Sequence, residues 1–178
     1  MKNFQKALTI AFIAVLLCVS AARWLSPVQA QMGIPDGMIR VASNFTVAET
    51  SDRLEALFEE RRLTVMARVD HAQNAASVGK ELGPTELFIF GNPAAGTPLM
   101  QCSQTVAIDL PQKMLIWQNE AGQVWLAYND PYYLMERHGI DECEMVIERI
   151  SQVLEDIAGR ATQTISAGHS DIRYDYLG

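Results

Sequence analysis

Four polar side chains at the ends of predicted strands and helices are the candidates for chemistry in this sequence. The candidate ligand-binding residues are His71, Asn92, Thr97 and Tyr128. His71 is the best catalytic candidate because it follows Asp70, whose carboxylate could fix the tautomer of the imidazole. An imidazole held in this way serves as a general base, a proton donor or a metal ligand. The alternative is a partly buried histidine that hydrogen-bonds to a loop backbone, so a catalytic role for His71 stays open.

The other three candidates each have a structural alternative. Asn92 precedes Pro93, which confines it to extended geometry, and its amide either satisfies nearby backbone groups or points into a pocket. Thr97 is predicted to cap a helix that begins at Pro98, and the free N–H groups of such a helix start could bind an anion. Tyr128 could donate a phenolic hydrogen bond into a cleft or simply pack in the core.

No established catalytic or cofactor motif is present in the sequence. It lacks a phosphate-cradling glycine loop, a paired-cysteine zinc site and a nucleophile elbow. The histidines at 71, 138 and 169 are too widely spread to predict a three-histidine zinc site. His138 precedes Gly139 and fits compensation of a helix C-terminal dipole. We therefore predict no cofactor and no metal, and His71 with Cys102 or an acid is the alternative metal site.

The first thirty residues have the pattern of a signal peptide. Lys2 and Lys6 form a positive start, and residues 7–22 are small and apolar. Sixteen helical residues span about 24 Å, which is short of the roughly 30 Å of a bilayer core. Small residues at 28 and 30 fit cleavage after Ala30. The expected location is periplasmic or secreted, without stable membrane insertion after cleavage, and the alternative is a retained N-terminal membrane anchor.

The balance of charges limits the classes of partner. The chain carries 14 basic and 21 acidic residues, and residues 1–30 contain three of the bases and no acid. The chain after cleavage therefore has 11 bases against 21 acids, a net charge of −10. A surface this acidic repels phosphate backbones and anionic lipid heads. We expect no nucleic-acid partner and no binding to an anionic membrane surface.

Two cysteines remain after cleavage, Cys102 and Cys143, in a compartment that permits disulfides. A disulfide between them would stabilise the fold by roughly 4 kcal/mol, on the estimate from the entropy of the unfolded chain. The alternative is that both are small apolar residues on helix faces. A disulfide between them is therefore possible, but the sequence does not show that their Cα atoms come within bridging distance.

The candidate residues depend on a predicted framework of five strands and several helices. The strands are expected at residues 39–45, 63–69, 87–90, 113–118 and 123–128. The helices are expected after a capping box at Thr46 and Glu49, at 73–82, after Thr97, after Asp130 and at 141–158. This pattern predicts one domain over 39–158, a lead-in at 31–38 and a mobile tail at 159–178. The fold class is α+β: a two-layer sandwich of β-α-β-β-β-β-α order, with helices on one face of a mainly antiparallel sheet.

Several short motifs resemble one known family. They are Asp70-His71, Gly91-Asn92-Pro93, residues 96–100 (GTPLM), Asp109-Leu110-Pro111 and Asn129-Asp130-Pro131. Over residues 39–157 the chain is similar to the domain-of-unknown-function 302 family. The resemblance implies a two-layer α+β sandwich and a homodimer, and it implies no activity. Cys102 departs from the usual small residue of the family, and Cys143 lies where the match is loose.

Three functions are compatible with these observations. The first is an exported, non-enzymatic module that binds a small molecule or a partner and forms a homodimer, with Trp117 and Trp125 as core or dimer-interface residues. The second is a structural or interaction protein without a ligand. The third is an enzyme that uses His71 as acid or base. The absence of a nucleophile, base and orienting group in the sequence favours the first.

Overall fold

The structure is a computed structural model that describes residues 37–163. The predicted signal peptide, its cleavage site after Ala30, most of the lead-in and residues 164–178 of the predicted tail lie outside the described residues. Within the described part, the predicted β-α-β-β-β-β-α order is confirmed, and three further helices and a short 3-10 helix are inserted between these elements.

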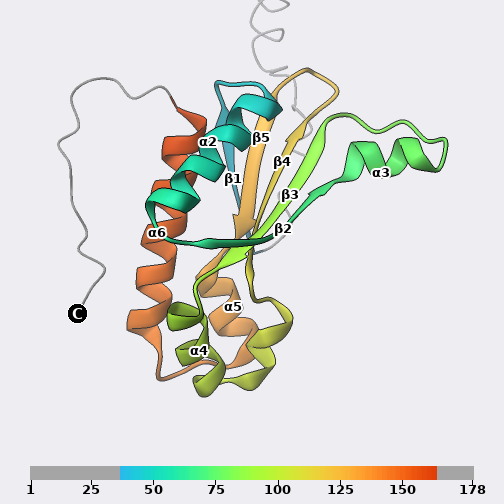
Figure 1. Ribbon diagram of the computed structural model, residues 1–178. Coiled ribbons are helices and arrows are strands. Elements are labelled where there is room, and N and C mark those ends of the chain that lie inside the picture. The colour runs from blue at the N-terminus through green and yellow to red at the C-terminus, as the bar shows by residue number, and fades with distance from the viewer. Residues whose placement is uncertain (1–36, 164–178) are drawn as a thin grey trace, which may run out of the picture. The chain divides into compact units, whose positions relative to one another are not determined.

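The five strands form one antiparallel sheet (Figure 1). The strands are β1 (Met38–Ser43), β2 (Thr64–Asp70), β3 (Thr85–Gly91), β4 (Gln112–Gln118) and β5 (Val124–Asn129). Their order across the sheet is β1-β5-β4-β3-β2, and every neighbouring pair is antiparallel. The first strand therefore pairs with the last strand, and β4 is the central strand of the sheet.

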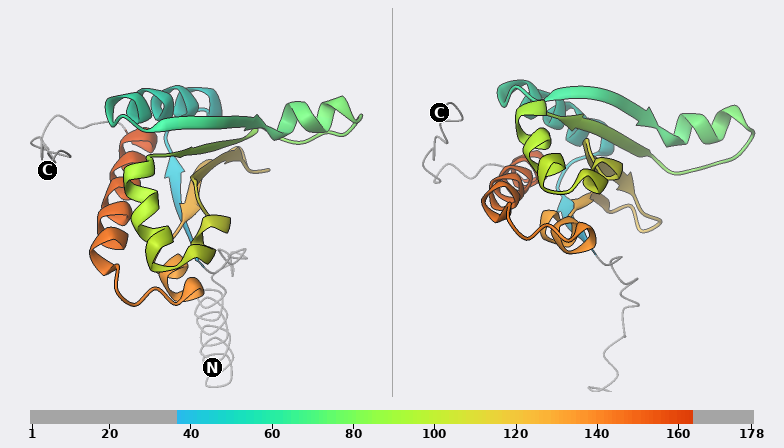
Figure 2. Two further views of the ribbon diagram at one scale, coloured as in Figure 1. Left: turned by 60° about the horizontal axis from the view of Figure 1, so that its bottom comes forward. Right: turned by 90° about the horizontal axis from the view of Figure 1, so that it is seen from below.

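The helices divide between one face of the sheet and one of its ends. The helices are α2 (Val47–Glu60), α3 (His71–Ser77), α4 (Pro93–Cys102), α5 (Pro131–His138) and α6 (Glu144–Thr162), with the 3-10 helix η1 (Gln104–Ile108). Helices α2 and α6 cover one face, and α4, η1 and α5 gather at one end (Figures 1 and 2). The predicted two-layer α+β class is confirmed.

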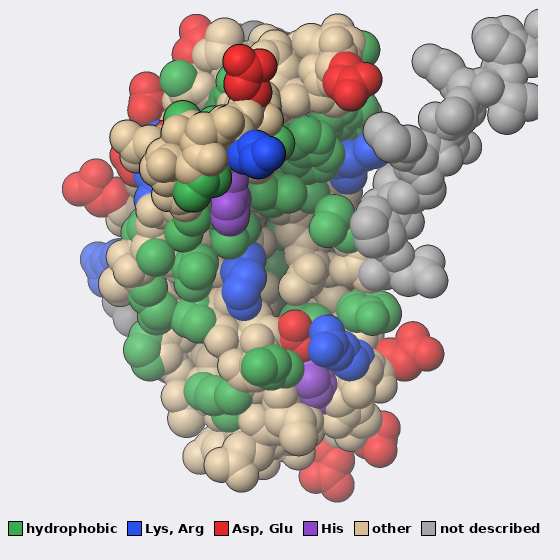
Figure 3. Space-filling model, turned by 90° about the vertical axis from the view of Figure 1, so that its right-hand side faces the viewer, with side chains coloured by type: hydrophobic (Ala, Val, Ile, Leu, Met, Phe, Trp, Pro, Cys, Tyr) green, Lys and Arg blue, Asp and Glu red, His purple; other side chains and the backbone are tan. Residues whose placement is uncertain are grey.

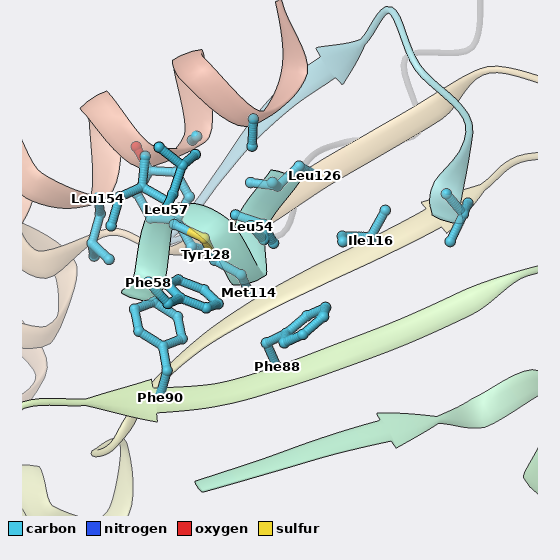
Figure 4. Close-up of a cluster of buried hydrophobic side chains, with 14 of the residues drawn as sticks. Leu54, Leu57, Phe58, Phe88, Phe90, Met114, Ile116, Leu126, Tyr128 and Leu154 are labelled. Atoms are coloured by element: carbon cyan, nitrogen blue, oxygen red, sulfur yellow. The ribbon is translucent and has the colours of Figure 1, made fainter. Parts of the chain in front are cut away.

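The main core lies between the sheet and the pair α2 and α6 (Figure 4). Phe58 of α2 stacks on Phe90 at a centroid distance of 4.1 Å and lies 5.9 Å from Phe88. All three rings are at most 1% exposed. Full burial of one such side chain stabilises the fold by roughly 1.5–3 kcal/mol. A second, smaller core of Leu99, Val106, Ile140 and Ile147 holds α4, η1 and α6 together.

The predicted capping box at the start of α2 is confirmed. The backbone N–H of Glu49 donates to the Thr46 hydroxyl at 3.2 Å, and the backbone N–H of Thr46 donates to the Glu49 carboxylate at 2.9 Å. The Thr46 hydroxyl also donates to this carboxylate at 2.7 Å, and the two bonds that the carboxylate accepts lower the pKa of Glu49. The predicted cap of α5 is also confirmed, because the N–H of Tyr132 donates to the Asp130 carboxylate at 2.9 Å.

The start of α4 differs from its prediction. Asn92, not Thr97, is the N-cap: its side-chain oxygen accepts from the N–H of Ala94 at 2.9 Å, and Pro93 is the first helical residue. Both Asn-Pro and Thr-Pro are typical of a helix start, and the earlier pair is used. Pro98 lies inside the helix, so the free N–H groups that we expected at Thr97 are absent.

The final helix begins three residues later and ends four residues later than the predicted 141–158. It runs from Glu144 to Thr162, so residues 159–162 belong to the helix and not to a tail. Its end is held by Arg53 of α2, whose guanidinium donates to the carbonyls of Arg160, Ala161 and Gln163. Because this guanidinium comes from a distant helix, the local sequence did not indicate where α6 ends.

Candidate functional site

His71 begins α3 without an orienting partner. The Asp70 carboxylate is occupied as the N-cap of α3, where it accepts from the backbone N–H of Gln73 at 2.8 Å. Among residues 37–163 the His71 imidazole has no hydrogen-bond partner, and the side chain is half-buried. The neighbouring carboxylate therefore serves the helix and not the imidazole. Because of this cap, the helix begins at His71, two residues earlier than the predicted 73–82, and it ends at Ser77, five residues earlier than predicted.

The remaining candidates have structural roles or lie on the surface. Asn92 is exposed and caps α4, and Thr97 is exposed in the middle of that helix. Tyr128 is 4% exposed and belongs to the main core (Figure 4). Burial, with smaller contributions from Glu155 and Asp130, raises the pKa of Tyr128 to about 12. The phenol therefore stays protonated and packs in the core.

The strand register keeps these four residues from lining one pocket. Thr64 pairs with Gly91, and Asp70 pairs with Glu86. His71 and Asn92 therefore follow opposite ends of the β2–β3 pair, separated by six residue steps of about 3.3 Å, or about 20 Å. Two neighbouring antiparallel strands run in opposite directions, so their C-terminal ends lie at opposite ends of the pair. Side chains that follow β2 and β3 therefore do not converge.

A shallow hollow of about 430 Å³ lies beside α3. It is lined by Arg68, Val69, Asp70, Gln73, Asn74 and Glu86. Arg68 donates to the carboxylates of Glu86 at 2.7 Å and Glu55 at 2.8 Å, and Ser51 donates to Glu86 at 2.8 Å. Since these charges already pair with one another, the hollow has no uncompensated cation or anion from this network to hold a charged ligand.

A polar cluster that the sequence did not predict surrounds His138. Its Nε2 lies 2.6 Å from the Asp109 carboxylate, and its Nδ1 lies 3.0 Å from the Thr105 hydroxyl. The Ser103 hydroxyl donates to the His138 carbonyl at 3.0 Å, and Lys113 donates to the Asp109 carbonyl at 2.8 Å. This cluster fastens η1 and the loop after it to the end of α5. Its members are about 30 residues apart in sequence, so only His138 itself, before Gly139, gave a local signal.

The two cysteines that remain after the predicted cleavage form a disulfide. Cys102 and Cys143 have Cα atoms 6.5 Å apart, and the bridge joins the end of α4 to the N-cap of α6. Cys102 is therefore not a partner of His71 in a metal site. Within the described ranges, no group of three or more histidine, cysteine or acidic residues could hold a metal ion.

The face of the sheet away from α2 and α6 is largely apolar, with Thr85 and Asn129 at its margins, and we call it the open face. Its members alternate with the core residues along the strands: Arg40, Ala42, Ala67, Val69, Leu87, Ile89, Lys113, Leu115, Trp117, Trp125 and Ala127. Apolar side chains gather on the side of the molecule that Figure 3 shows. Trp117 and Trp125 pair directly across β4 and β5, so of their two predicted roles the structure excludes the core.

Arg40 is an unusual member of the open face. Its guanidinium carbon lies 4.1 Å from the centroid of the Trp125 ring. Its Nε is buried and has no hydrogen-bond partner, and no carboxylate within residues 37–163 pairs with the side chain. A buried guanidinium nitrogen without an acceptor costs free energy. Within the described part of the chain, Arg40 is therefore held by the Trp125 ring while its Nε stays without an acceptor.

No helix of the described part is long and apolar enough to cross a membrane.

Comparison with known proteins gives a family and a small set of relatives. The model of the family described as "Domain of unknown function DUF302" matches residues 39–157. The chain is 45% identical over 107 residues to the "Fluoride-specific ion channel FluC 1" of Brucella suis biovar 1 (strain 1330) and of Brucella abortus biovar 1 (strain 9-941). The match covers 60% of this chain but 42% and 40% of those relatives, so the chain spans about two fifths of their length.

A solved structure has the same fold. It is that of an uncharacterized conserved DUF302 protein from Bacillus stearothermophilus, with a TM-score of 0.65 and 17% sequence identity. The likeness covers 71% of this chain and 98% of that one. At this identity the likeness concerns the fold alone.

Proposed function

Because the chain belongs to the DUF302 family, which is described without an activity, we propose its function from its own surface: it is an exported, non-enzymatic binding module that works as a homodimer. The open face is its binding surface. Export follows from the signal-peptide pattern of residues 1–30.

The observation that carries this proposal is the composition of the open face. An antiparallel sheet with one face in water normally alternates apolar and polar residues. Here the middle parts of β3 and β4 are apolar on both faces: Leu87, Leu115 and Trp117 on the open face alternate with Phe88, Met114 and Ile116 in the core. A contiguous apolar surface of this kind is typical of an interface.

A catalytic role for His71 has less support. A general base needs an orienting group and a substrate site within reach. The Asp70 carboxylate is engaged with Gln73, and the hollow beside α3 is shallow and internally paired. These observations give His71 neither an orienting group nor a formed substrate site at this end of the sheet.

A sedimentation experiment tests the proposal. The purified protein is expected to be a dimer at micromolar concentration. Leu115→Asp places a charge in the open face and is expected to weaken the dimer at least tenfold. Met145→Asp is the matched control, since Met145 is 83% exposed at the start of α6 and should leave the dimer unchanged. A wild-type monomer at these concentrations would contradict the proposal.

The relatives favour a second candidate function. They match this chain over 107 residues and are named as fluoride-specific ion channels, and about three fifths of their length lies outside the match. This supports a role as an accessory module of a fluoride channel. Fluoride efflux from vesicles that contain such a channel, measured with and without this protein, would test it. An unchanged efflux rate, together with no co-purification, would exclude this candidate.

A further inference from the structure

The connection between β2 and β3, residues 71–84, projects from the sheet, and we call it the arm. It contains α3 and the segment after it, and it extends beyond the ends of the neighbouring strands (Figures 1 and 2). No residue of α3 is buried. Val78 and Leu82, which follow the helix, are 71% and 51% exposed. The arm therefore presents apolar side chains that its own chain does not cover.

The arm needs a surface to pack against. A helix of seven residues is far below the roughly 12–15 residues at which an isolated helix becomes marginally stable in water. The Asp70 cap supplies one hydrogen bond at its start, and no buried apolar contact adds to it. The arm extends away from the sheet along the direction of the strands (Figure 2), so it does not fold back onto the open face of the same copy.

The charges on the open face and on the arm are complementary. The strand residues of the open face include two cations, Arg40 and Lys113, and no acidic residue. The arm carries Glu81 next to Leu82. Within the part of the chain that the structure describes, Glu81 has no ion-pair partner, just as Arg40 has none. One copy thus holds an unpaired cation on its apolar face and an unpaired anion on its apolar arm.

We infer that the arm of each copy lies across the open face of a second copy, with Val78 and Leu82 against the Trp117–Trp125 surface and Glu81 paired with Arg40. The inference rests on the proposed homodimer and names the contact that forms it. A two-fold axis makes the contact twice, since each copy offers one arm and one face. It gives the Arg40 guanidinium an acceptor and buries the two apolar side chains of the arm.

A charge exchange tests the pairing of Glu81 with Arg40. Arg40→Glu and Glu81→Arg each place like charges at both contacts, and each is expected to weaken dimerisation at least tenfold in sedimentation velocity. An equimolar mixture of the two variants brings opposite charges together at both contacts and is expected to restore the dimer. The double variant should restore it as well. Glu142→Arg, an exposed site at the other end of the molecule, is the control for net charge.

The apolar part is tested with Leu82→Asp, which lies on the exposed arm and should leave the melting temperature of the monomer unchanged. It is expected to weaken the dimer at least tenfold. A wild-type dimer that Leu115→Asp disrupts, but that Leu82→Asp and the charge variants leave intact, would overturn the arm contact and leave the proposed function standing. A wild-type monomer would overturn both. Weakening by the single charge variants without recovery in the mixture would overturn the Glu81–Arg40 pair.

Discussion

The two faces of the sheet are made from similar residues but meet different surroundings. On the face covered by α2 and α6, Phe88, Met114, Ile116 and Leu126 are fully buried. On the open face, Leu87, Leu115, Trp117 and Trp125 are only half-buried, although they are just as apolar. The difference shows that the alternation of a strand does not reveal whether its second face meets water or another surface. It also separates residues that hold the monomer together from the residues of the proposed binding surface.

The covered face should carry most of the stability of the monomer. Phe58→Ala removes the ring that packs between Phe88 and Phe90, and it is expected to lower the free energy of unfolding by about 3–5 kcal/mol. Urea unfolding followed by circular dichroism measures this. A loss below about 1 kcal/mol would mean that the covered face is not the main core.

The disulfide should stabilise the end of the molecule that holds the smaller core. Replacing Cys102 and Cys143 together by serine is expected to cost about 2–4 kcal/mol, because the bridge closes a loop of 41 residues in the unfolded chain. The dimer should persist, since the bridge joins α4 to α6 and does not include the open face. Sedimentation of the oxidised and reduced proteins checks this, and dissociation on reduction would contradict the separation of the two regions.

The guanidinium of Arg53 should hold the last turn of α6 against the covered face. Arg53→Ala leaves three carbonyls without this donor, and it is expected to cost about 1–2 kcal/mol. Hydrogen exchange at Ala161, Thr162 and Gln163 should become faster, while exchange in β4 stays slow. Unchanged exchange at these three amides would mean that water replaces the guanidinium without cost.

The open face should contribute little to the monomer and much to the dimer. Trp117→Ala removes a half-buried side chain and is expected to lower the free energy of unfolding of the monomer by about 1 kcal/mol. The same change is expected to raise the dimer dissociation constant at least tenfold. A loss of monomer stability as large as that of Phe58→Ala, with the dimer unaffected, would reverse the roles of the two faces.

Acid should affect the helices of the covered face first, and only slightly. The Thr46 bonds lower the pKa of Glu49, and the side-chain bond with Arg160 lowers that of Glu60. A carboxylate with a lowered folded-state pKa stabilises the fold above its ordinary pKa, and this contribution is lost as the pH falls through the folded value. Stability should therefore be level above about pH 5 and decline below the ordinary pKa of 4.5. Thr46→Ala should make the decline shallower, and an identical slope would contradict this assignment.

The sequence was informative where structure depends on neighbouring residues. The capping box at Thr46 and the N-cap at Asp130 use side chains within three residues of their partners, and both were predictable. The order of strands and helices along the chain followed from hydrophobic alternation and from the family resemblance, whereas the order of the strands across the sheet came only from the structure. Two successive residue-proline pairs, Asn92-Pro93 and Thr97-Pro98, gave equal signals for one helix start, and only the structure distinguishes them.

The candidate site was less predictable because it depends on long-range geometry. Whether His71 and Asn92 lie together depends on the register of β2 and β3, and this register places them at opposite ends of the two strands. The His138–Asp109–Thr105 cluster and the Arg53 contacts join residues from 29 to 110 positions apart. The unpaired state of Arg40 is likewise a property of three-dimensional packing, since nothing beside it in the sequence indicates that its partner is missing.

Tryptophan fluorescence offers the most direct test of the open face as an interface. The chain has three tryptophans, and the proposed cleavage after Ala30 would leave only Trp117 and Trp125, both on the open face. Acrylamide quenching of the protein that begins at Gln31 should be weak at high concentration, where the second copy covers both rings. It should increase on dilution, with a shift of the emission to longer wavelength. Quenching that is strong and the same at every concentration would show that the open face stays in water, and would contradict the account.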